Sequence, residues 1–308
     1  MQAISLTLSQ ATAMTEEEAR EYFEAILWPG GATCPHCGST RAWEVKSASA
    51  RPGVYTCADC EKQYTVTVQT IMHGSHITLR QWAIAIHLMT SSKKGVSALQ
   101  LQRNLGLGSY KSAWHLAHRI RYAMSEGTLC APLKGTVEVD ECYIGGKTRE
   151  GKRGRGSERK TPVVALVERD GRVRSKPIER VDTKTLKAAI RENVHRDSRI
   201  MTDEWSPYQG IGTEFAGGHE VVNHGKKEYV RGDAYTNTVE SYFALLKRGI
   251  HGIFHNVSKR HLHRYCDEFN FRWNFRKIDD GERTIEAIRG TVGKRLSYKP
   301  SVSGMILN

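Results

Sequence analysis

Three observations predict a multidomain fold, in which a small cysteine-rich module and a helical region precede an α/β domain with a mixed sheet. Two C-x-x-C pairs lie between residues 34 and 60, helical periodicity follows from residue 78, and strand patterns begin at residue 135. A chain of 308 residues is long enough for two or three domains of ordinary size. We therefore expect separate cores rather than one.

The cysteine-rich module is expected to be a zinc ribbon of residues 34–72, preceded by an N-terminal helical segment of residues 1–33. In that segment, Thr15 and Glu18 have the spacing of a capping box. Nineteen residues separate the two cysteine pairs, and such paired knuckles in an intracellular chain favour a metal over disulfides. The expected ligands of one structural Zn²⁺ are Cys34, Cys37, Cys57 and Cys60.

The helical region, residues 76–126, contains apolar residues at helical spacing and a turn at Gly106-Leu107-Gly108. Helix, turn and second helix together indicate a helix-turn-helix, with a helical hairpin that only packs as the alternative. The side chains expected to point outward from the second helix are Tyr110, Lys111, His115, Arg119 and Arg121. Lys111, His115 and Arg119 are the expected DNA contacts among them.

The charge of the chain predicts a polyanionic partner. The formal net charge is +13 and the pI is near 9.4. Residues 145–160 carry seven Lys or Arg against two Glu. We expect Lys152, Arg153 and Arg155 in this run to contact the DNA backbone, with a solvated turn as the alternative.

No membrane or secretory segment is expected. The sequence has no run of eighteen apolar residues. Its N-terminus has neither a basic region nor a continuous apolar stretch of the kind that secretory signals have. A cytoplasmic location without a membrane partner is therefore the expectation.

The α/β domain is expected to span residues 133–280, with a polar, partly irregular tail at 281–308. Its strands are predicted at 136–145, 161–171, 172–181 and 198–205, and its helices at 183–194, from near Asn237, and from about Ser258. Strands followed by strand–helix alternation predict a mixed sheet. Asn237 is interpreted as the cap of its helix.

Three acids on separate elements of this domain are candidate metal ligands. Asp140 lies in the first strand, Asp203 ends the strand RIMTD, and Glu240 lies near the start of a helix. Carboxylates are the ligands that a pair of Mg²⁺ ions needs for phosphoryl transfer. Lys247 is two helical turns beyond Glu240 on the same face and would hold a DNA phosphate. Each acid alone is more often structural, and it is their combination that favours a metal site.

Other acids and a histidine lie beside these candidates. Strand alternation puts Glu138 on the face of Asp140 and Glu141 on the opposite face. The part played by Glu138, Glu141 and Glu204 is left open by the sequence. His224 is a candidate neighbour of the scissile phosphate, with a solvent-facing position as the alternative.

Four stretches carry a family resemblance: VDECYIGGK, TDEWSPY, VNHGKKEYV and TNTVESYFALLKRG with the residues that follow it to Arg276. Over roughly residues 15–280, the sequence resembles the DDE transposases of bacterial insertion sequences, and among them the insertion-sequence-1595-like group. The resemblance implies a zinc ribbon joined to a ribonuclease-H-like catalytic domain. The residues that match the catalytic pattern of the family are Asp140, Asp203, Glu240 and Lys247.

The resemblance also implies an activity and partners. The enzyme would bind two Mg²⁺ or Mn²⁺ ions, cleave the transposon end to leave a 3′-OH, and join that end to target DNA. Double-stranded DNA, as terminal repeats and as target, would be the partner, with Arg248 beside Lys247 as a further contact. Pairing two ends implies a homodimer or a larger assembly. The alternatives are a ribonuclease-H-like nuclease without strand transfer and a non-enzymatic zinc-ribbon DNA-binding regulator.

Overall fold

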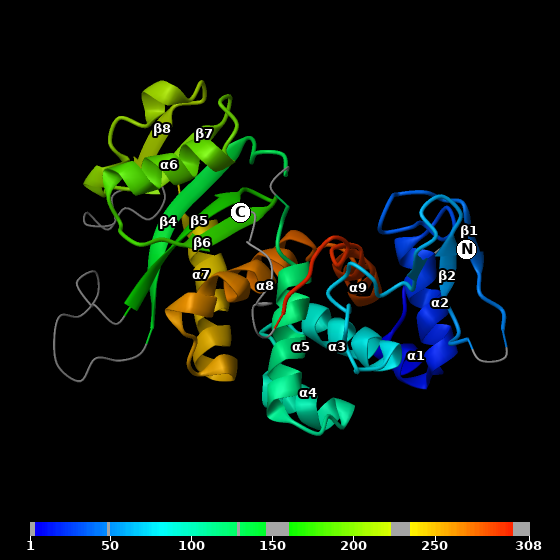
Figure 1. Cartoon of the computed structure of the whole chain (residues 1–308). Helices are drawn as coiled ribbons and strands as arrows, with labels where there is room; N and C mark the ends of the chain where they lie inside the picture. The colour runs from blue at the N-terminus through cyan, green and yellow to red at the C-terminus, as the bar shows by residue number, and fades with distance from the viewer. Residues whose placement is uncertain (1–3, 48–49, 128–129, 146–159, 223–234, 298–308) are drawn as a thin grey trace. The chain divides into compact units, whose positions relative to one another are not determined.

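The structure, a computed structural model, describes residues 4–47, 50–127, 130–145, 160–222 and 235–297 (Figure 1). The chain divides into two compact units. The first unit contains residues 1–125 and 278–308, and the second contains residues 126–277. Within the described residues, no helix is both long enough and apolar enough to cross a membrane.

The first unit is mainly helical. Side-chain caps begin its helices, and Thr7, Thr15, Thr78 and Asp279 each form a reciprocal capping box with the residue three positions on. The helices of this unit are α1 (Leu8–Ala13), α2 (Glu16–Leu27), α3 (Leu79–Ser91), α4 (Ala98–Leu105), α5 (Tyr110–Ala123) and α9 (Asp280–Arg289).

The zinc ribbon is a three-stranded antiparallel sheet in the order β1-β2-β3. Its strands are β1 (Ala42–Glu44), β2 (Tyr55–Cys57) and β3 (Gln63–Tyr64). Short strands offer little apolar surface, and the core of the ribbon is correspondingly small. It consists of Cys34, Cys57 and Tyr64 with a few partly buried neighbours, among them Trp28. A metal is the usual way to stabilise such a module.

Helices α4 and α5 are joined by a short turn, which is the helix, turn and second helix that the sequence predicts. Gly106 ends α4 in the left-handed region, with φ of 63°, which glycine adopts without a steric penalty. Ser109 then caps α5 through a hydrogen bond from the Ser112 N–H group. Ala113, Leu116 and Ala117 are buried along the inner stripe that the sequence predicts.

Residues after 280 do not begin as an irregular tail. They form α9, in which Ile285, Ala287 and Ile288 are buried. The helix packs against α3, and the hydroxyl groups of Thr284 and Thr90 lie 3.2 Å apart between them. Helix α9, the last helix among the described residues, therefore belongs to the first unit rather than to the sheet domain that precedes it.

The second unit contains a mixed five-stranded sheet with the order β6-β5-β4-β7-β8. Strand β5 is antiparallel to β4 and β6, whereas β7 and β8 run parallel to β4. This order and these directions make the sheet ribonuclease-H-like. Its strands are β4 (Thr136–Gly145), β5 (Lys160–Glu168), β6 (Val173–Pro177), β7 (Arg199–Asp203) and β8 (His219–Val222).

Helices cover both faces of this sheet (Figure 1). Helix α6 (Thr183–Asn193) packs on one face against Val137 and Val139 of β4. Helices α7 (Asn237–Gly249) and α8 (Leu262–Asn274) pack on the other face against Cys142 and Ile144. Because side chains alternate along a strand, each apolar run of β4 lies in a separate core.

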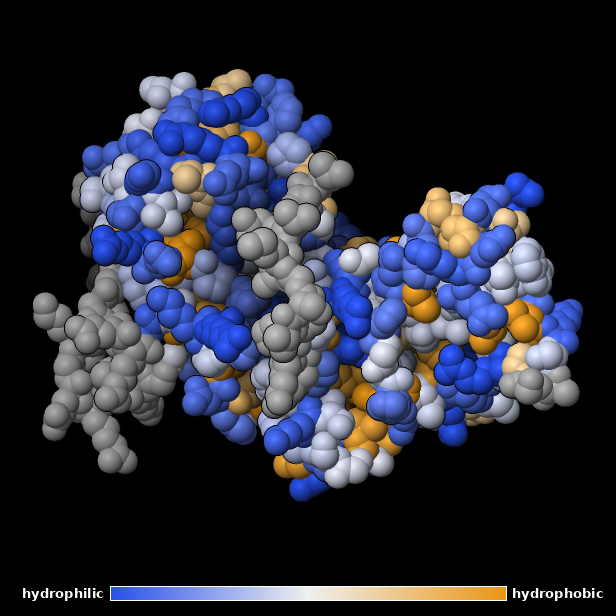
Figure 2. Space-filling model, viewed as in Figure 1, coloured by the Kyte–Doolittle hydropathy of each residue, from blue (hydrophilic) through white to orange (hydrophobic). Residues whose placement is uncertain are grey.

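Short irregular helices connect these elements. They are the 3₁₀ turns Ser206–Tyr208, Gly212–Glu214 and Lys259–His261 and the π-helical turn Ile250–Phe254. Tyr208 and its neighbour Trp205 pack into the core under α6. Figure 2 shows that one face of the molecule is mostly hydrophilic, with apolar residues gathered in small patches.

Candidate nucleic-acid processing site

Asp140 lies on the face of β4 that α7 covers. Its neighbours along the strand on the same face are Glu138 and Cys142, and Cys142 belongs to the core under α7. Strand β7 runs parallel to β4, with Glu138 opposite Met201. Continuing that register by two residues brings Asp203 level with Asp140, so both carboxylates project from adjacent strands in the same direction.

Asp203 is the last residue of β7, where the chain turns away from the sheet. Its Oδ1 atom accepts a hydrogen bond from the Trp205 N–H group at 3.2 Å. This local turn is typical of aspartate, whose short side chain bonds to the backbone two residues on. The carboxyl end of a strand in an α/β sheet is a common position for ligand-binding groups.

Glu240 and Lys247 come from α7. Glu240 lies in its first turn and is exposed, and Lys247 lies near its carboxyl end. Burial raises the pKa of the Cys142 thiol to about 12, and the positive charge of Lys247 acts in the opposite direction. Lys247 is therefore near the part of β4 that carries Asp140.

The pKa of Asp140 is raised to about 7. Burial is the main cause, and the negative charges of Glu141, Asp203 and Glu240 raise it further. The Glu141 N–H group, which donates to Asp140 Oδ1 at 2.7 Å, acts in the opposite direction. The charges of Asp203 and Glu240 therefore both act on Asp140, and these are the three acids that the sequence singles out. Mutual repulsion among such carboxylates is what a bound cation relieves.

The raised pKa predicts that the metal-free protein loses stability as pH rises. Because the folded-state pKa of about 7 lies above the ordinary value of 3.8, the folded protein binds this proton more tightly than the unfolded chain does. This contribution to stability is complete below pH 3.8 and is lost as pH rises through 7. Denaturant unfolding in EDTA should therefore show that the free energy of unfolding falls between pH 3.8 and 7. Asp140→Asn should abolish this fall. An unchanged slope in the variant would assign the effect to another group.

Glu141 and Glu138 have different partners. Glu141 is buried on the α6 side, where its Oε2 atom accepts a hydrogen bond from the Tyr208 hydroxyl at 2.8 Å. Glu138 is fully buried on the α7 side and accepts from the backbone at the start of α7. The interpretation of Asn237 as a helix cap is therefore wrong: the cap position is Thr236, whose side chain accepts no capping hydrogen bond, and Glu138 accepts the N–H groups of the first turn instead. No local pattern in the sequence marks this contact.

The four ribbon cysteines form an assembled ligand set. Their sulfur atoms all lie within 4.8 Å of one another, and two pairs are separated by 3.7 and 3.5 Å. Four thiolates at about 2.3 Å from one Zn²⁺ have sulfur atoms about 3.8 Å apart in a tetrahedron. The set fits one structural Zn²⁺. Within the described part of the chain, no three carboxylates lie as close to one another as these four sulfur atoms do.

Backbone N–H groups support the thiolate form of Cys57. Burial raises its pKa, but the N–H groups of Cys60 and Asp59 outweigh that effect together with neighbouring thiols, and the pKa falls to about 6. The knuckle therefore offers a deprotonated ligand near neutral pH. His36, inside the first knuckle, is exposed, as expected once four cysteines complete the site.

The candidate DNA contacts have different positions. Lys111 and Arg248 are exposed, and His115 is half-buried. Arg119 and Arg121, expected to point outward, are instead buried. Arg119 donates to the backbone carbonyls of Leu296 and His73 at 3.1 and 3.0 Å, which makes it a structural residue of the first unit. The candidates outside the described residues are Lys152, Arg153, Arg155 and His224.

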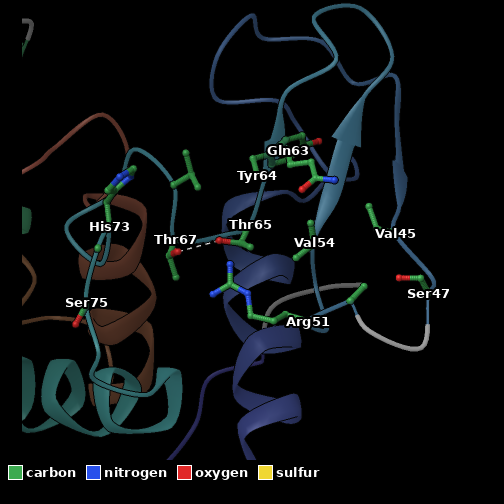
Figure 3. A pocket seen from close by; sticks show the side chains of 13 residues that line it. Val45, Ser47, Arg51, Val54, Gln63, Tyr64, Thr65, Thr67, His73 and Ser75 are labelled. Atoms are coloured by element: carbon green, nitrogen blue, oxygen red, sulfur yellow. Dashed lines mark hydrogen bonds between the residues drawn. The ribbon is translucent and has the colours of Figure 1, made fainter.

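A polar depression of about 610 Å³ lies in the first unit beside the ribbon. Figure 3 shows Arg51 extending toward Thr65 and Thr67, with His73 and Ser75 on the segment that follows. The hydroxyl groups of Thr65 and Thr67 are hydrogen-bonded at 2.9 Å. Among the described residues that line this depression none is acidic, so these residues offer no ligands of the kind that the carboxylates on β4, β7 and α7 provide.

Comparison with known proteins gives a consistent family. Residues 132–274 match the model of the ISXO2-like transposase domain, and residues 14–63 match that of the transposase zinc-ribbon domain. An uncharacterized protein in transposable element ISH50 of Halobacterium salinarum is 29% identical over 300 residues, which cover 91% of this chain and 98% of that protein. With its ribonuclease-H-like sheet and four-cysteine ribbon, the chain belongs to the insertion-sequence-1595-like group of DDE transposases.

Proposed function

We propose that this transposase binds the terminal repeats of an insertion sequence, cleaves the 3′ ends of the element in an Mg²⁺-dependent reaction, and joins them to target DNA. The observation that carries the proposal is the electrostatic coupling of Asp203 and Glu240 to a buried Asp140. Separate elements supply these three carboxylates, and a cation bound among them would relieve their mutual repulsion.

Asp140, Asp203 and Glu240 would hold two Mg²⁺ or Mn²⁺ ions. Oxygen ligands suit these hard cations, and two such ions activate an attacking oxygen and stabilise a leaving one during phosphoryl transfer. Lys247, from the same helix as Glu240, would hold a phosphate of the DNA backbone beside the acids. Its ammonium group is a compact point charge suited to that contact.

Two displacements at phosphorus make up the proposed reaction. In the first, a water oxygen bonds to the phosphorus at the transposon end, the bond to the 3′ oxygen breaks, and that oxygen takes a proton to become a 3′-OH. In the second, the oxygen of this hydroxyl loses its proton and bonds to a phosphorus of target DNA, the bond from that phosphorus to the 3′ oxygen of the target breaks, and the released oxygen takes up a proton. The number of phosphodiester bonds is conserved in the second step, so no external energy source is needed.

DNA binding is assigned to the ribbon, to the helix-turn-helix and to the basic surface near the acids. Lys111 at the start of α5 and Arg248 beside Lys247 are exposed and suited to phosphate contacts. His115 is a weaker candidate because it is half-buried, and the buried Arg119 is excluded. The candidates outside the described residues, Lys152, Arg153, Arg155 and His224, stay predictions from the sequence. Joining two ends requires two copies of the site, so a dimer or a larger assembly is proposed.

One assay tests this function. Purified protein is incubated with a labelled duplex carrying the terminal repeat, Mg²⁺ and a target plasmid, and products are resolved on denaturing gels. The proposal predicts end cleavage followed by a joined product, with both lost in Glu240→Gln. Cleavage without joining would favour a nuclease, and binding without cleavage would favour a non-enzymatic regulator. Either result contradicts the proposed function.

A further inference from the structure

Glu138 is a buried carboxylate whose oxygen atoms are fully engaged. Its Oε2 atom accepts the N–H groups of Thr238 and Val239 at 2.8 and 3.1 Å. Its Oε1 atom accepts the Thr238 hydroxyl and the Arg169 Nε–H group, both at 2.9 Å. A carboxylate has about four lone-pair sites, so these four donors leave none for a metal ion. Although Glu138 shares a strand face with Asp140, it does not have the free oxygen that a ligand needs.

The donors come from the first turn of α7, which otherwise has no side-chain cap. Thr236 occupies the cap position without a capping hydrogen bond from a helix N–H group, and its hydroxyl donates instead to Glu240 Oε1 at 3.4 Å. The first N–H groups of a helix have no partner within the helix and carry the positive end of its dipole. A buried carboxylate from β4 satisfies two of them and compensates this charge. Strand β4 thus caps the helix that packs on it.

Arg169 extends the same contact to the residue before the helix. It follows β5 directly, and its backbone N–H group donates to Thr136 of β4 at 3.0 Å. Its guanidinium group donates to Glu138 and to the Tyr235 carbonyl, the latter at 2.9 Å. The group also stacks on the Tyr235 ring, with its Cζ atom 3.7 Å from the ring centroid. The start of α7 is therefore fixed to β4 and to the end of β5.

This contact connects two of the three proposed metal ligands. On the strand, Glu138 is two residues before Asp140 and on the same face. On the helix, Glu240 directly follows Val239, whose N–H group Glu138 accepts. A shift of the first turn of α7 along β4 would therefore change the separation of the Asp140 and Glu240 carboxylates.

We propose that Glu138 is a positioning residue, which fixes the first turn of α7 on β4 and so holds Glu240 at the distance from Asp140 that a shared metal site requires. The inference rests on the proposed function, because it assumes that Asp140 and Glu240 are ligands. Residues that orient metal ligands affect metal affinity strongly even though they do not touch the metal.

Glu138→Gln tests the proposal. All four hydrogen-bond partners of Glu138 are donors. The NH₂ group of the glutamine side chain would face such donors and could not accept from them. We expect faster hydrogen exchange at the amides of residues 238–240, and a Mn²⁺ affinity of the DNA-free full chain weakened by about 10- to 100-fold. In end cleavage, kcat should fall while KM for DNA changes little.

Glu268→Gln is the matched control. Glu268 is also fully buried in the second unit and paired with an arginine, Arg272, but it lies on α8. Its loss should lower thermal stability without altering Mn²⁺ affinity or exchange at residues 238–240. If Glu138→Gln does not fold, Thr238→Val removes one of the four hydrogen bonds with little change of shape. It should produce smaller effects of the same sign.

Two results would overturn the proposal. Unchanged exchange in the first turn of α7 would mean that Glu138 does not hold the helix. A loss of Mn²⁺ affinity with unchanged exchange would make Glu138 a ligand rather than a positioning residue. Failure of the proposed function would give a different result, namely a wild-type protein that does not cleave end DNA. Hydrogen exchange at residues 238–240 could still be compared between the wild type and Glu138→Gln in that case. Faster exchange in the variant would support the contact between Glu138 and α7 by itself.

Discussion

Asp203→Asn is expected to reduce transposon-end cleavage by about 10³-fold, because it removes one ligand charge from a site whose metal ions contribute several kcal/mol to transition-state stabilisation. Asparagine keeps the size of the side chain and an oxygen that can accept the Trp205 N–H group. The turn at the end of β7 should therefore persist. Binding of end DNA should stay close to the wild-type affinity, since the change removes chemistry rather than a DNA contact.

Single-turnover cleavage of a labelled end duplex measures this effect, with DNA affinity measured in parallel. Asp197→Asn is the matched control, because Asp197 is a highly exposed aspartate of the same unit, and its ion-pair partner among the described residues is His195, at 3.5 Å. It should cleave at the wild-type rate. A cleavage rate for Asp203→Asn within a few-fold of this control would remove Asp203 from the site.

Cys34→Ser is expected to release the zinc and unfold the ribbon. Structural Zn²⁺ sites supply about 10–16 kcal/mol of apparent binding free energy, which is also folding free energy. The ribbon core, built around Cys34, Cys57 and Tyr64, is too small to replace it. The sheet of the second unit has its own cores under α6 and α7 and should remain folded.

Zinc content per chain and hydrogen exchange across residues 34–68 measure this result. Cys130→Ser provides the control, because Cys130 is exposed and lies outside the ribbon. It should retain one zinc per chain and a protected ribbon. Wild-type zinc content in Cys34→Ser would contradict the four-cysteine site. Loss of the second unit's fold together with the ribbon's would contradict the expectation that the second unit is stabilised by its own cores.

The parts of the fold that follow from local patterns could be predicted from the sequence. Alternation along 136–145 matches β4 residue by residue, because one strand face lies under α6 and the other under α7. The two C-x-x-C pairs predict the ribbon because thiolates at that spacing suit a single tetrahedral metal. The turn at Gly106 is equally local, since it requires a left-handed residue.

The rest depends on contacts between distant residues. Helical periodicity alone could not show that Arg119 is buried, because its partners are backbone carbonyls 46 and 177 positions away. The short strand β8 has little pattern of its own and is defined by pairing with β7. The role of Glu138 depends on N–H groups 100 and 101 positions away, so sequence reasoning gives only its strand face.

Anomalous scattering from Mn²⁺ in crystals of the full chain with transposon-end DNA would show which side chains hold the metal. We expect manganese peaks bound by the carboxylates of Asp140, Asp203 and Glu240, with Glu138 still hydrogen-bonded to the first turn of α7. Manganese held elsewhere, or bound by Glu138 or Glu141 in place of these three acids, would contradict the account.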